Sequence, residues 1–170
     1  MDVFFEQIVE KKKNAKEYVL LALIWFAVAA IAIFIMLNAA LLGPITLLPI
    51  IAIGYGAYKI SMNFFVEYEY IITNGTLDID KIVAKSSRKR VASIELSSVD
   101  SLERYTPASK PKAGYERIVI ACDESDNNAY AIVVVKEGRG RQYIVFSPND
   151  KIKGAVVKFL PKFIANSAFK

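Results

Sequence analysis

Residues 18–58 read YVLLALIWFAVAAIAIFIMLNAALLGPITLLPIIAIGYGAY, a run of 41 residues without Asp, Glu, Lys or Arg. The remaining 129 of the 170 residues hold all the charged side chains, 22 Lys or Arg and 17 Asp or Glu. The apolar fraction of 54% and the charged fraction of 23% therefore average two unlike parts, an apolar block and a polar remainder. This distribution excludes a simple soluble enzyme, a disordered tail and a disulfide-rich secreted module.

The apolar block is long enough for two membrane spans. Residues 18–37 and 41–58 supply 20 and 18 residues, and a span needs about 20. Asn38, Gly43 and Pro44 are turn-forming residues between the two segments, so a transmembrane helical hairpin over residues 18–62 is predicted. A cleaved signal peptide is the alternative, but its apolar region is usually only about 7–15 residues long. Pro49 predicts a kink in the second span.

The lysines that flank the block predict its orientation. Four precede the first span, one follows the second, and none lies in the turn: Lys11, Lys12, Lys13, Lys16 and Lys59. The positive-inside rule then predicts a two-pass protein of the cell membrane with both termini in the cytoplasm. In residues 1–17, Val3, Phe4, Phe5, Ile8 and Val9 lie among acids and lysines, which suggests a short amphipathic helix on the membrane surface. A plain helical lead-in is the alternative.

Small residues recur in the second span. Ala52 and Gly56 are four residues apart, with Gly54 between them, a spacing that permits close helix packing. They are candidates either for packing within the hairpin or for self-association between chains.

The polar remainder, residues 63–170, predicts seven strands and a helix. Alternation in residues 64–73 and 76–85 flanks Asn74-Gly75, the signal for a two-residue hairpin turn, and a shift of phase predicts a bulge near Lys81. Five further strands fit residues 88–96, 99–105, 117–122, 130–136 and 142–147. Short connections predict an antiparallel meander closed into a barrel. A helix with Ser147 as N-cap and an apolar stripe through residues 152–160 would cap it, ending at Pro161.

Two segments carry a resemblance to a known family. The run YIITNGTLDID at residues 70–80, followed by SIELSSVDSLE at residues 93–103, resembles the bacterial membrane-anchored pleckstrin-homology-like (PH-like) proteins. In that pattern Ile94, Leu96, Val99 and Leu102 fill the apolar positions. The chain as a whole, over about residues 1–160, is similar to short two-helix membrane proteins with a cytoplasmic PH-like domain. The resemblance implies an α+β membrane protein and supplies no reaction.

Composition argues against catalysis. The chain has no histidine, which removes the commonest general base and metal ligand. Its only cysteine, Cys122, lies in an apolar run and is expected to be a buried core residue. Asp78 and Asp80 lie two residues apart, on the same face of a strand. Polar residues that alternate along the exposed face of an antiparallel strand explain this pair more simply than a metal site or a shared proton. We expect no catalytic residue, metal or cofactor. The net charge of +5 is too small to argue for nucleic acid.

Two basic groups are candidate contact sites. Lys85, Arg88, Lys89 and Arg90 could meet anionic lipid headgroups, or they could form a solvated charged turn. Phosphate binding at the first hairpin is not expected, because Asp78 and Asp80 flank it. Lys110 and Lys112 lie in the one long loop, which is either a docking segment or a flexible connection.

The sequence therefore predicts a non-catalytic membrane-anchored protein. Its partners would be the bilayer and either another protein or a second copy of the chain. The alternative is an accessory or sensor subunit whose hairpin binds another membrane protein or lipid. An enzyme that uses carboxylates and a metal is a third, less favoured class.

Overall fold

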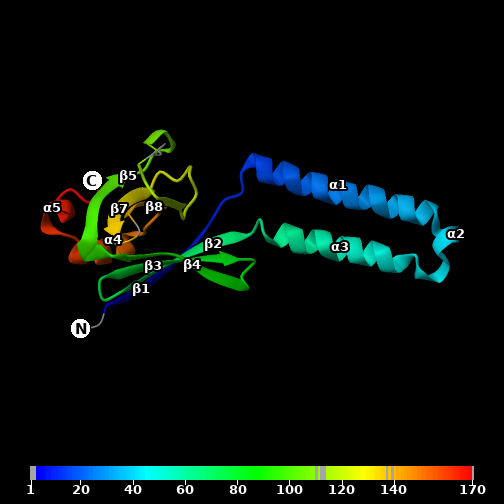
Figure 1. Ribbon diagram of the computed structural model, residues 1–170, viewed down its shortest axis with the longest axis horizontal. Coiled ribbons are helices and arrows are strands. Elements are labelled where there is room, and N and C mark those ends of the chain that lie inside the picture. The colour runs from blue at the N-terminus through cyan, green and yellow to red at the C-terminus, as the bar shows by residue number, and fades with distance from the viewer. Residues whose placement is uncertain (1–2, 110, 112–113, 137, 139, 170) are drawn as a thin grey trace. The chain divides into compact units, whose positions relative to one another are not determined.

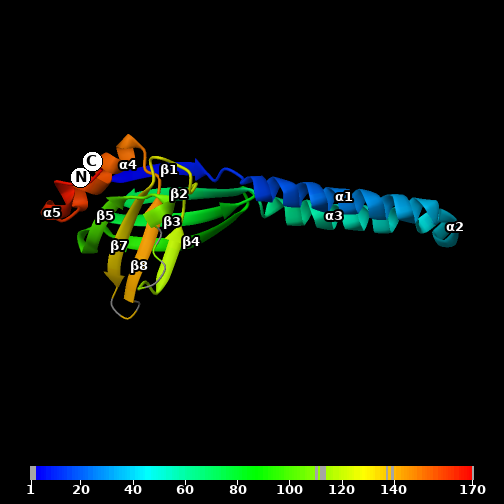
Figure 2. The same cartoon turned by 90° about the horizontal axis from the view of Figure 1, so that it is seen from above.

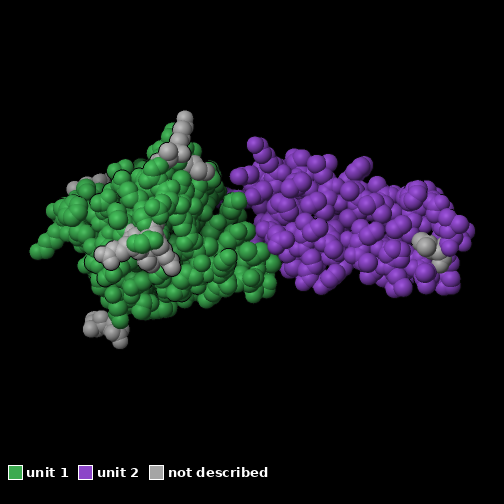
Figure 3. Space-filling model, in the orientation of Figure 1, with its two compact units in different colours: residues 1–11, 66–170 green, residues 12–65 purple. Residues whose placement is uncertain are grey.

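The computed structural model describes residues 3–109, 111, 114–136, 138 and 140–169, with Leu42 and Lys136 as backbone only. The chain forms two compact units (Figure 3). One consists of Met1–Lys11 together with Val66–Lys170, and the other is Lys12–Phe65. The first unit thus includes residues that precede the apolar block.

The apolar unit is a helical hairpin. It contains α1 (Ala15–Leu37), α2 (Ala39–Leu42), a 3-10 turn η1 (Gly43–Ile45) and α3 (Leu47–Met62) (Figure 1). Asn14 and Glu17 form a capping box that starts α1. The half-buried apolar residues of α1 recur every three or four positions, the spacing of one helix face: Leu21, Ile24, Val28, Ala32 and Ile35.

Pro49 does not fall where the sequence placed it. It is the third residue of α3, because α3 begins at Leu47 rather than at residue 41. An amide in the first turn has no partner within the helix, so a proline there removes no hydrogen bond. At this position Pro49 does not disrupt the helix, so the reason for predicting a kink no longer applies.

The N-terminal segment is a strand, and the expected amphipathic helix is wrong. β1 (Phe4–Glu10) alternates exposed and half-buried residues and pairs antiparallel with β2 (Val66–Thr73), Phe4 opposite Thr73 and Glu10 opposite Glu67. A helix of seven residues gains little by itself. Pairing instead buries one side of Phe5 and Val9 against the core, and this tertiary gain decides the conformation.

The first sheet has the order β1-β2-β3-β4, with β3 (Thr76–Val83) and β4 (Ser87–Glu95) (Figure 2). Asn74 and Gly75 both have positive φ, as the predicted hairpin turn requires. A Cβ on Gly75 would meet the Phe159 ring at 3.1 Å, so glycine also permits this contact. The bulge lies between Ile79 and Asp80 in the β3–β4 pairing, close to the predicted site.

The second sheet differs from the predicted meander. After the 3-10 turn η2 (Leu96–Ser98) come β5 (Val99–Arg104), η3 (Pro107–Ser109), β6 (Arg117–Ile120), β7 (Tyr130–Lys136) and β8 (Gly140–Phe146). Their order is β5-β7-β8-β6, and β6 pairs with β8 in parallel. The described residues form eight strands in two sheets of four, rather than seven in one meander. The extra strand is β1, which belongs to the first sheet. In the second sheet, the long connections before and after β6 let β6 pass to the edge beyond β8.

Two helices follow the second sheet, α4 (Asp150–Phe159) and α5 (Lys162–Ala165). The N-cap is Asn149, not the predicted Ser147, and its Oδ1 accepts a hydrogen bond from the Ile152 N–H at 2.9 Å. Pro161 separates the helices, as predicted. One core joins both sheets and α4, and includes the buried residues Tyr70, Ile72, Leu77, Ile94, Ile132, Ile144, Phe146, Ile152 and Val156.

Candidate functional site

Three of the four bases predicted to face an anionic surface are engaged by acids of β2 and β3. Arg88 donates to Glu69 at 3.0 Å, and Arg90 lies 2.8 Å from Asp78 and 3.0 Å from Asp80. Lys85 is 3.7 Å from Glu67. These pairs cross from β4 and the β3–β4 turn onto β2 and β3. The cluster is therefore an ion-pair ladder on the outer face of the first sheet.

The acids of this ladder are more buried than its bases. Glu69 and Asp80 stand opposite each other on β2 and β3, and are only 1% and 5% exposed. Burial raises the pKa of the Glu69 carboxyl, a hydrogen bond with Glu6 on β1 raises it further, and Arg88 opposes both. The hydrogen bond to Asp80 raises the pKa of Arg90. These acids hold the arginines, which explains the Asp78 and Asp80 pattern without a metal.

The remaining base, Lys89, is exposed and stands opposite Lys81 of β3. Within the described part of the chain, no three Asp, Glu or Cys side chains form a group that could hold a metal ion. The ladder has no surplus of positive charge, since its three engaged bases (Lys85, Arg88 and Arg90) meet four acids (Glu67, Glu69, Asp78 and Asp80).

The other predicted contact, at Lys110 and Lys112, falls outside the described residues. The ends of that loop are held in place. Ser109 and Thr106 exchange hydrogen bonds at 2.7 and 3.0 Å, and the Tyr115 ring packs edge-on against Tyr143, with centroids 5.2 Å apart.

The small residues of α3 have open space beside them. A Cβ built on Gly54 or on Gly56 would meet nothing within 4 Å, and Ala52 is exposed. Close packing inside the hairpin therefore does not account for these glycines.

Cys122 is a buried thiol, as predicted. It is 1% exposed and lies in a small cluster with Tyr105, Tyr143 and Val145. Burial raises the pKa of its thiol to about 12, so the reactive thiolate is scarce at neutral pH.

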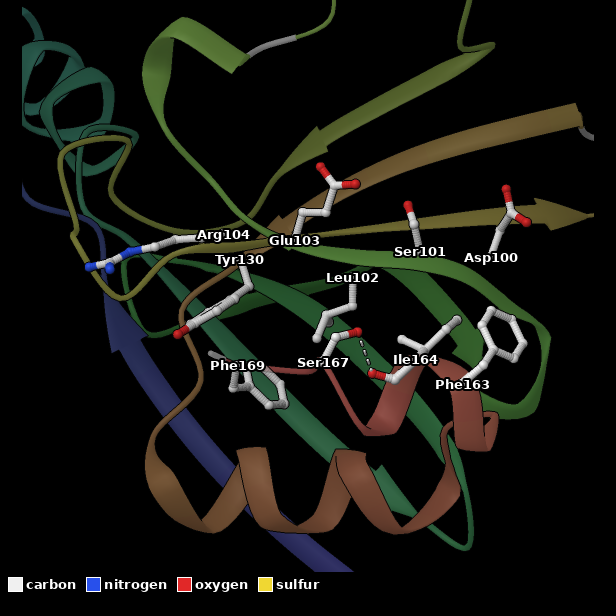
Figure 4. A pocket seen from close by; sticks show the side chains of 10 residues that line it. All are labelled: Asp100, Ser101, Leu102, Glu103, Arg104, Tyr130, Phe163, Ile164, Ser167 and Phe169. Carbon is white, nitrogen blue, oxygen red and sulfur yellow. Dashed lines mark hydrogen bonds between the residues drawn. The ribbon is translucent and has the colours of Figure 1, made fainter.

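Sequence reasoning missed a groove between β5 and the C-terminal helix α5 (Figure 4). Its volume is about 410 Å³. Its walls come from β5, from Tyr130 of β7, and from Phe163, Ile164, Ser167 and Phe169. Phe163 is 73% exposed, although it lines this groove. The sequence carried one signal for the groove, an apolar Phe163-Ile164 pair placed after the helix-stopping Pro161.

A second feature missed from sequence joins the two ends of the chain. The Gln7 side chain of β1 donates to the Ser147 carbonyl at 3.0 Å and accepts from the Asn149 N–H at 2.8 Å. The N-terminal strand is thereby tied to the start of α4.

Two packed sheets that share one core with a C-terminal helix define a mixed α+β, PH-like class of protein. Within that class, the chain belongs to the bacterial PH-like domain family (DUF6106), whose family model matches residues 1–166. The match includes both the apolar hairpin and β1, so these segments belong to the family's pattern. No curated protein and no solved structure shows significant similarity to the chain.

Proposed function

We propose that the chain is a non-catalytic membrane protein whose hairpin crosses the cell membrane twice. Its PH-like unit would lie on the cytoplasmic side and mediate interaction with a protein partner or self-association. The observation that carries this proposal is the insertion of the apolar hairpin between two paired strands, β1 and β2.

The character of the two helices supports a membrane location. Ala15–Leu37 has a mean hydropathy of 3.0 and no buried residue, and Gly43–Met62 has a mean hydropathy of 1.4 with 17% of its apolar window buried. A core helix of a soluble protein would bury most of its apolar surface. A hydrocarbon environment would cover what these helices leave exposed.

The position of β1 argues against a cleaved signal peptide. Cleavage after α1 would remove β1, which pairs with β2 along seven residues and contributes Phe5 and Val9 to the core. The helix must therefore remain attached for the sheet to keep its first strand.

Strand pairing also favours two spans whose ends emerge on one side. Glu10 stands opposite Glu67, so the chain leaves the sheet and returns to it at adjacent positions. Lysines and aromatic rings gather near these ends, as is typical of a membrane interface. Lys13 Nζ lies 3.3 Å from the Phe65 ring centroid, and Lys59 Nζ lies 5.5 Å from that of Tyr55. This basic flank supports a cytoplasmic side for both termini.

Alkaline extraction of membranes tests the anchor. The full chain should stay in the membrane pellet, whereas a variant with residues 12–65 replaced by Asn-Gly should be soluble. Asn38→Cys in the turn should react with a membrane-impermeant maleimide in intact cells. Ser125→Cys should react only after permeabilisation. A full chain released by carbonate, or the reverse labelling pattern, would overturn the proposal.

The interaction role rests on the open glycines of α3. The Cβ of Gly56→Leu would meet nothing within 4 Å, so we expect the variant to keep the fold and to weaken association only where α3 packs on another helix. Co-purification and cross-linking from native membranes in mild detergent measure this effect. Ala29→Leu, on an exposed position of α1, is the matched control.

The alternative is an accessory or sensor subunit whose hairpin binds another membrane protein or lipid. The same α3 surface would then hold a different chain. Recovery of a second protein, lost with Gly56→Leu, favours the subunit, whereas recovery of cross-linked copies of this chain favours self-association.

Contact of the basic cluster with anionic lipid is retained as a secondary proposal. Lys89 is its best-placed member, because it is exposed beside Lys81 while the other three bases are engaged by acids. The test is binding of the full chain to anionic vesicles. Equal binding by the parent and by Lys89→Glu would exclude this lipid contact.

A further inference from the structure

One row of residues across the first sheet places two lysines side by side. Val9, Tyr68, Lys81 and Lys89 stand opposite one another along the adjacent strands β1, β2, β3 and β4 (Figure 2). Directly opposed residues of an antiparallel pair point to the same face, with Cβ atoms about 4.5–5.5 Å apart. Because Val9 and Tyr68 pack against the core, both lysines lie on this inner face of the sheet.

The two lysines have no acid to balance them. The ion-pair ladder occupies the outer face, where each engaged base meets an acid. Lys81 is half-buried and Lys89 is exposed, and neither makes a hydrogen bond or an ion pair with any residue that the structure describes. Like charges directly opposite each other destabilise a sheet. An anion held between these two ammonium groups would remove that repulsion.

Tyr68 adds a hydroxyl group to the same row. Its side chain is directly opposite Lys81 and only 9% exposed, and its hydroxyl has no hydrogen-bond partner within the described ranges. Burial raises the pKa of the Tyr68 phenol and the nearby Lys11 opposes this effect, so the hydroxyl keeps its proton at neutral pH. A buried hydroxyl without a partner costs free energy unless a ligand or water satisfies it.

The chemistry of this row fits a phosphate group. Two ammonium groups and one hydroxyl all donate hydrogen bonds, and bonds from a charged donor to a phosphate oxygen are among the strongest in proteins. A phosphate can accept from all three at once. A carboxylate ligand would offer fewer oxygens and less charge to the same donors.

The row also lies close along the chain to the apolar hairpin. It is two residues from Lys11 and Val66, which are bonded to each other at 3.0 Å where β1 and β2 lead into the hairpin. From Met62, the last residue of α3, to Tyr68 the chain can extend by at most about 20 Å. With the hairpin in a bilayer, lipid headgroups are therefore the nearest source of phosphate.

We propose that Lys81, Lys89 and the Tyr68 hydroxyl bind the phosphate group of an anionic lipid headgroup. The inference deepens the lipid contact of the proposed function and rests on it. It moves that contact from the basic turn to the inner face of the sheet. The two ammonium groups neutralise the phosphate, and the hydroxyl fixes its position by donating a hydrogen bond.

Protection of lysines from an amine-reactive reagent tests the site in the full chain. Nanodiscs of phosphatidylcholine alone are compared with nanodiscs that also contain phosphatidylglycerol, and mass spectrometry locates the modified residues. Phosphatidylglycerol should slow the modification of Lys81 and Lys89 severalfold. Lys158 is the control, because the adjacent Phe159 contacts Gly75 at the opposite end of the sheet. Equal rates for Lys81 and Lys89 in both nanodiscs would overturn the proposal.

A second arm identifies the source of the phosphate. The full chain in neutral detergent micelles is labelled in inorganic phosphate and in chloride of equal ionic strength. Protection by phosphatidylglycerol, with or without protection by inorganic phosphate, supports the lipid site. Protection by inorganic phosphate alone would assign a soluble ligand and overturn the lipid headgroup as its source.

Variants separate a built site from diffuse attraction between charges. Lys81→Gln and Lys89→Gln should each weaken binding of phosphatidylglycerol about tenfold or more, measured by native mass spectrometry of the full chain in neutral micelles. Lys85→Gln removes the same charge from the neighbouring turn and should have a smaller effect. Circular dichroism checks that each variant is folded.

Tyr68→Phe removes a hydroxyl without changing any charge, so it should weaken binding only if the site exists. Tyr130→Phe, at a buried position of the second sheet, is its control. Equal losses from Lys81→Gln and Lys85→Gln, with no effect of Tyr68→Phe, would leave a diffuse lipid contact and overturn the site. If the chain resists carbonate extraction while Lys81 and Lys89 are unprotected, the membrane anchor stands and only this inference fails.

Discussion

The Gln7 side chain accepts a hydrogen bond from the Asn149 N–H at 2.8 Å, a contact between residues 142 positions apart. The same amide donates to the Ser147 carbonyl at 3.0 Å. Asn149 is the N-cap of α4, so Gln7 fixes the residue that starts the helix. The strand that precedes the hairpin and the helix that closes the core are therefore stabilised together.

Replacing Gln7 by Leu should loosen β1. The change removes both hydrogen bonds and leaves the part-buried Ser147 carbonyl without this donor, a loss of about 1–3 kcal/mol, whereas the exposed Asn149 N–H can bond to water. Hydrogen exchange of the β1 amides should become about tenfold faster or more, measured by mass spectrometry on the full chain in micelles. Glu10→Ala, on the exposed face of the same strand, is the control. Equal exchange in the two variants would show that Gln7 does not hold β1.

Excision of the hairpin should leave a folded domain only when β1 is kept. Lys11 N–H donates to the Val66 carbonyl at 3.0 Å, so these residues can flank a two-residue turn. A chain of residues 1–11, Asn-Gly and 66–170 should be monodisperse and unfold cooperatively. Residues 66–170 alone lose Phe5 and Val9 and expose the edge of β2, so they should aggregate. Calorimetry and light scattering compare the two, and equal behaviour would make β1 dispensable.

The features predictable from sequence were those set by local chemistry. The Asn74-Gly75 turn, the two apolar helices and the buried Cys122 follow from turn preference, length and hydropathy. The errors arose where distant pairing decides. β1 reads equally as an amphipathic helix until β2, 56 residues further on, supplies its partner. The parallel pairing of β6 and the acids that engage Arg88 and Arg90 are likewise fixed by register between strands, which a single sequence does not specify.

Arg90 and Lys89 should differ in their effect on stability. Arg90→Met leaves Asp80, 5% exposed, and the neighbouring Asp78 without their cation, and should destabilise the PH-like unit by about 1–3 kcal/mol. Lys89→Met removes an exposed charge and should change stability by less than about 0.5 kcal/mol. Denaturant unfolding of the hairpin-excised chain measures both. Similar values for the two would mean that the ladder does not stabilise the sheet.

The β3–β4 turn should tolerate glycine better than its present residue. Lys85 has a φ of 56°, in the left-handed region that favours glycine. Its contact with Glu67 at 3.7 Å is largely solvent-exposed and contributes little. Lys85→Gly should therefore raise stability by about 0.5–1 kcal/mol. Ser86→Gly, where φ is not positive, is the control and should be destabilising. The thermal midpoint compares them, and a lower midpoint for Lys85→Gly would contradict this account of the turn.

The Glu6–Glu69 pair should make the attachment of β1 sensitive to pH. Burial, and the hydrogen bond that the protonated Glu69 carboxyl donates to Glu6, raise the pKa of Glu69 in the folded state. A carboxyl with a raised pKa contributes stability below its unfolded pKa of about 4.3, and loses it as pH rises through the folded value. Unfolding free energy should therefore fall with rising pH across that window. Glu6→Gln supplies an amide donor that favours the Glu69 carboxylate, so the variant should be more stable at neutral pH and show a flatter profile. Glu95→Gln, an exposed position on β4, is the matched control. Denaturant unfolding of the hairpin-excised chain from pH 4 to 8 measures the profiles, and parallel curves for the parent and Glu6→Gln would show that the two carboxyl groups are not coupled.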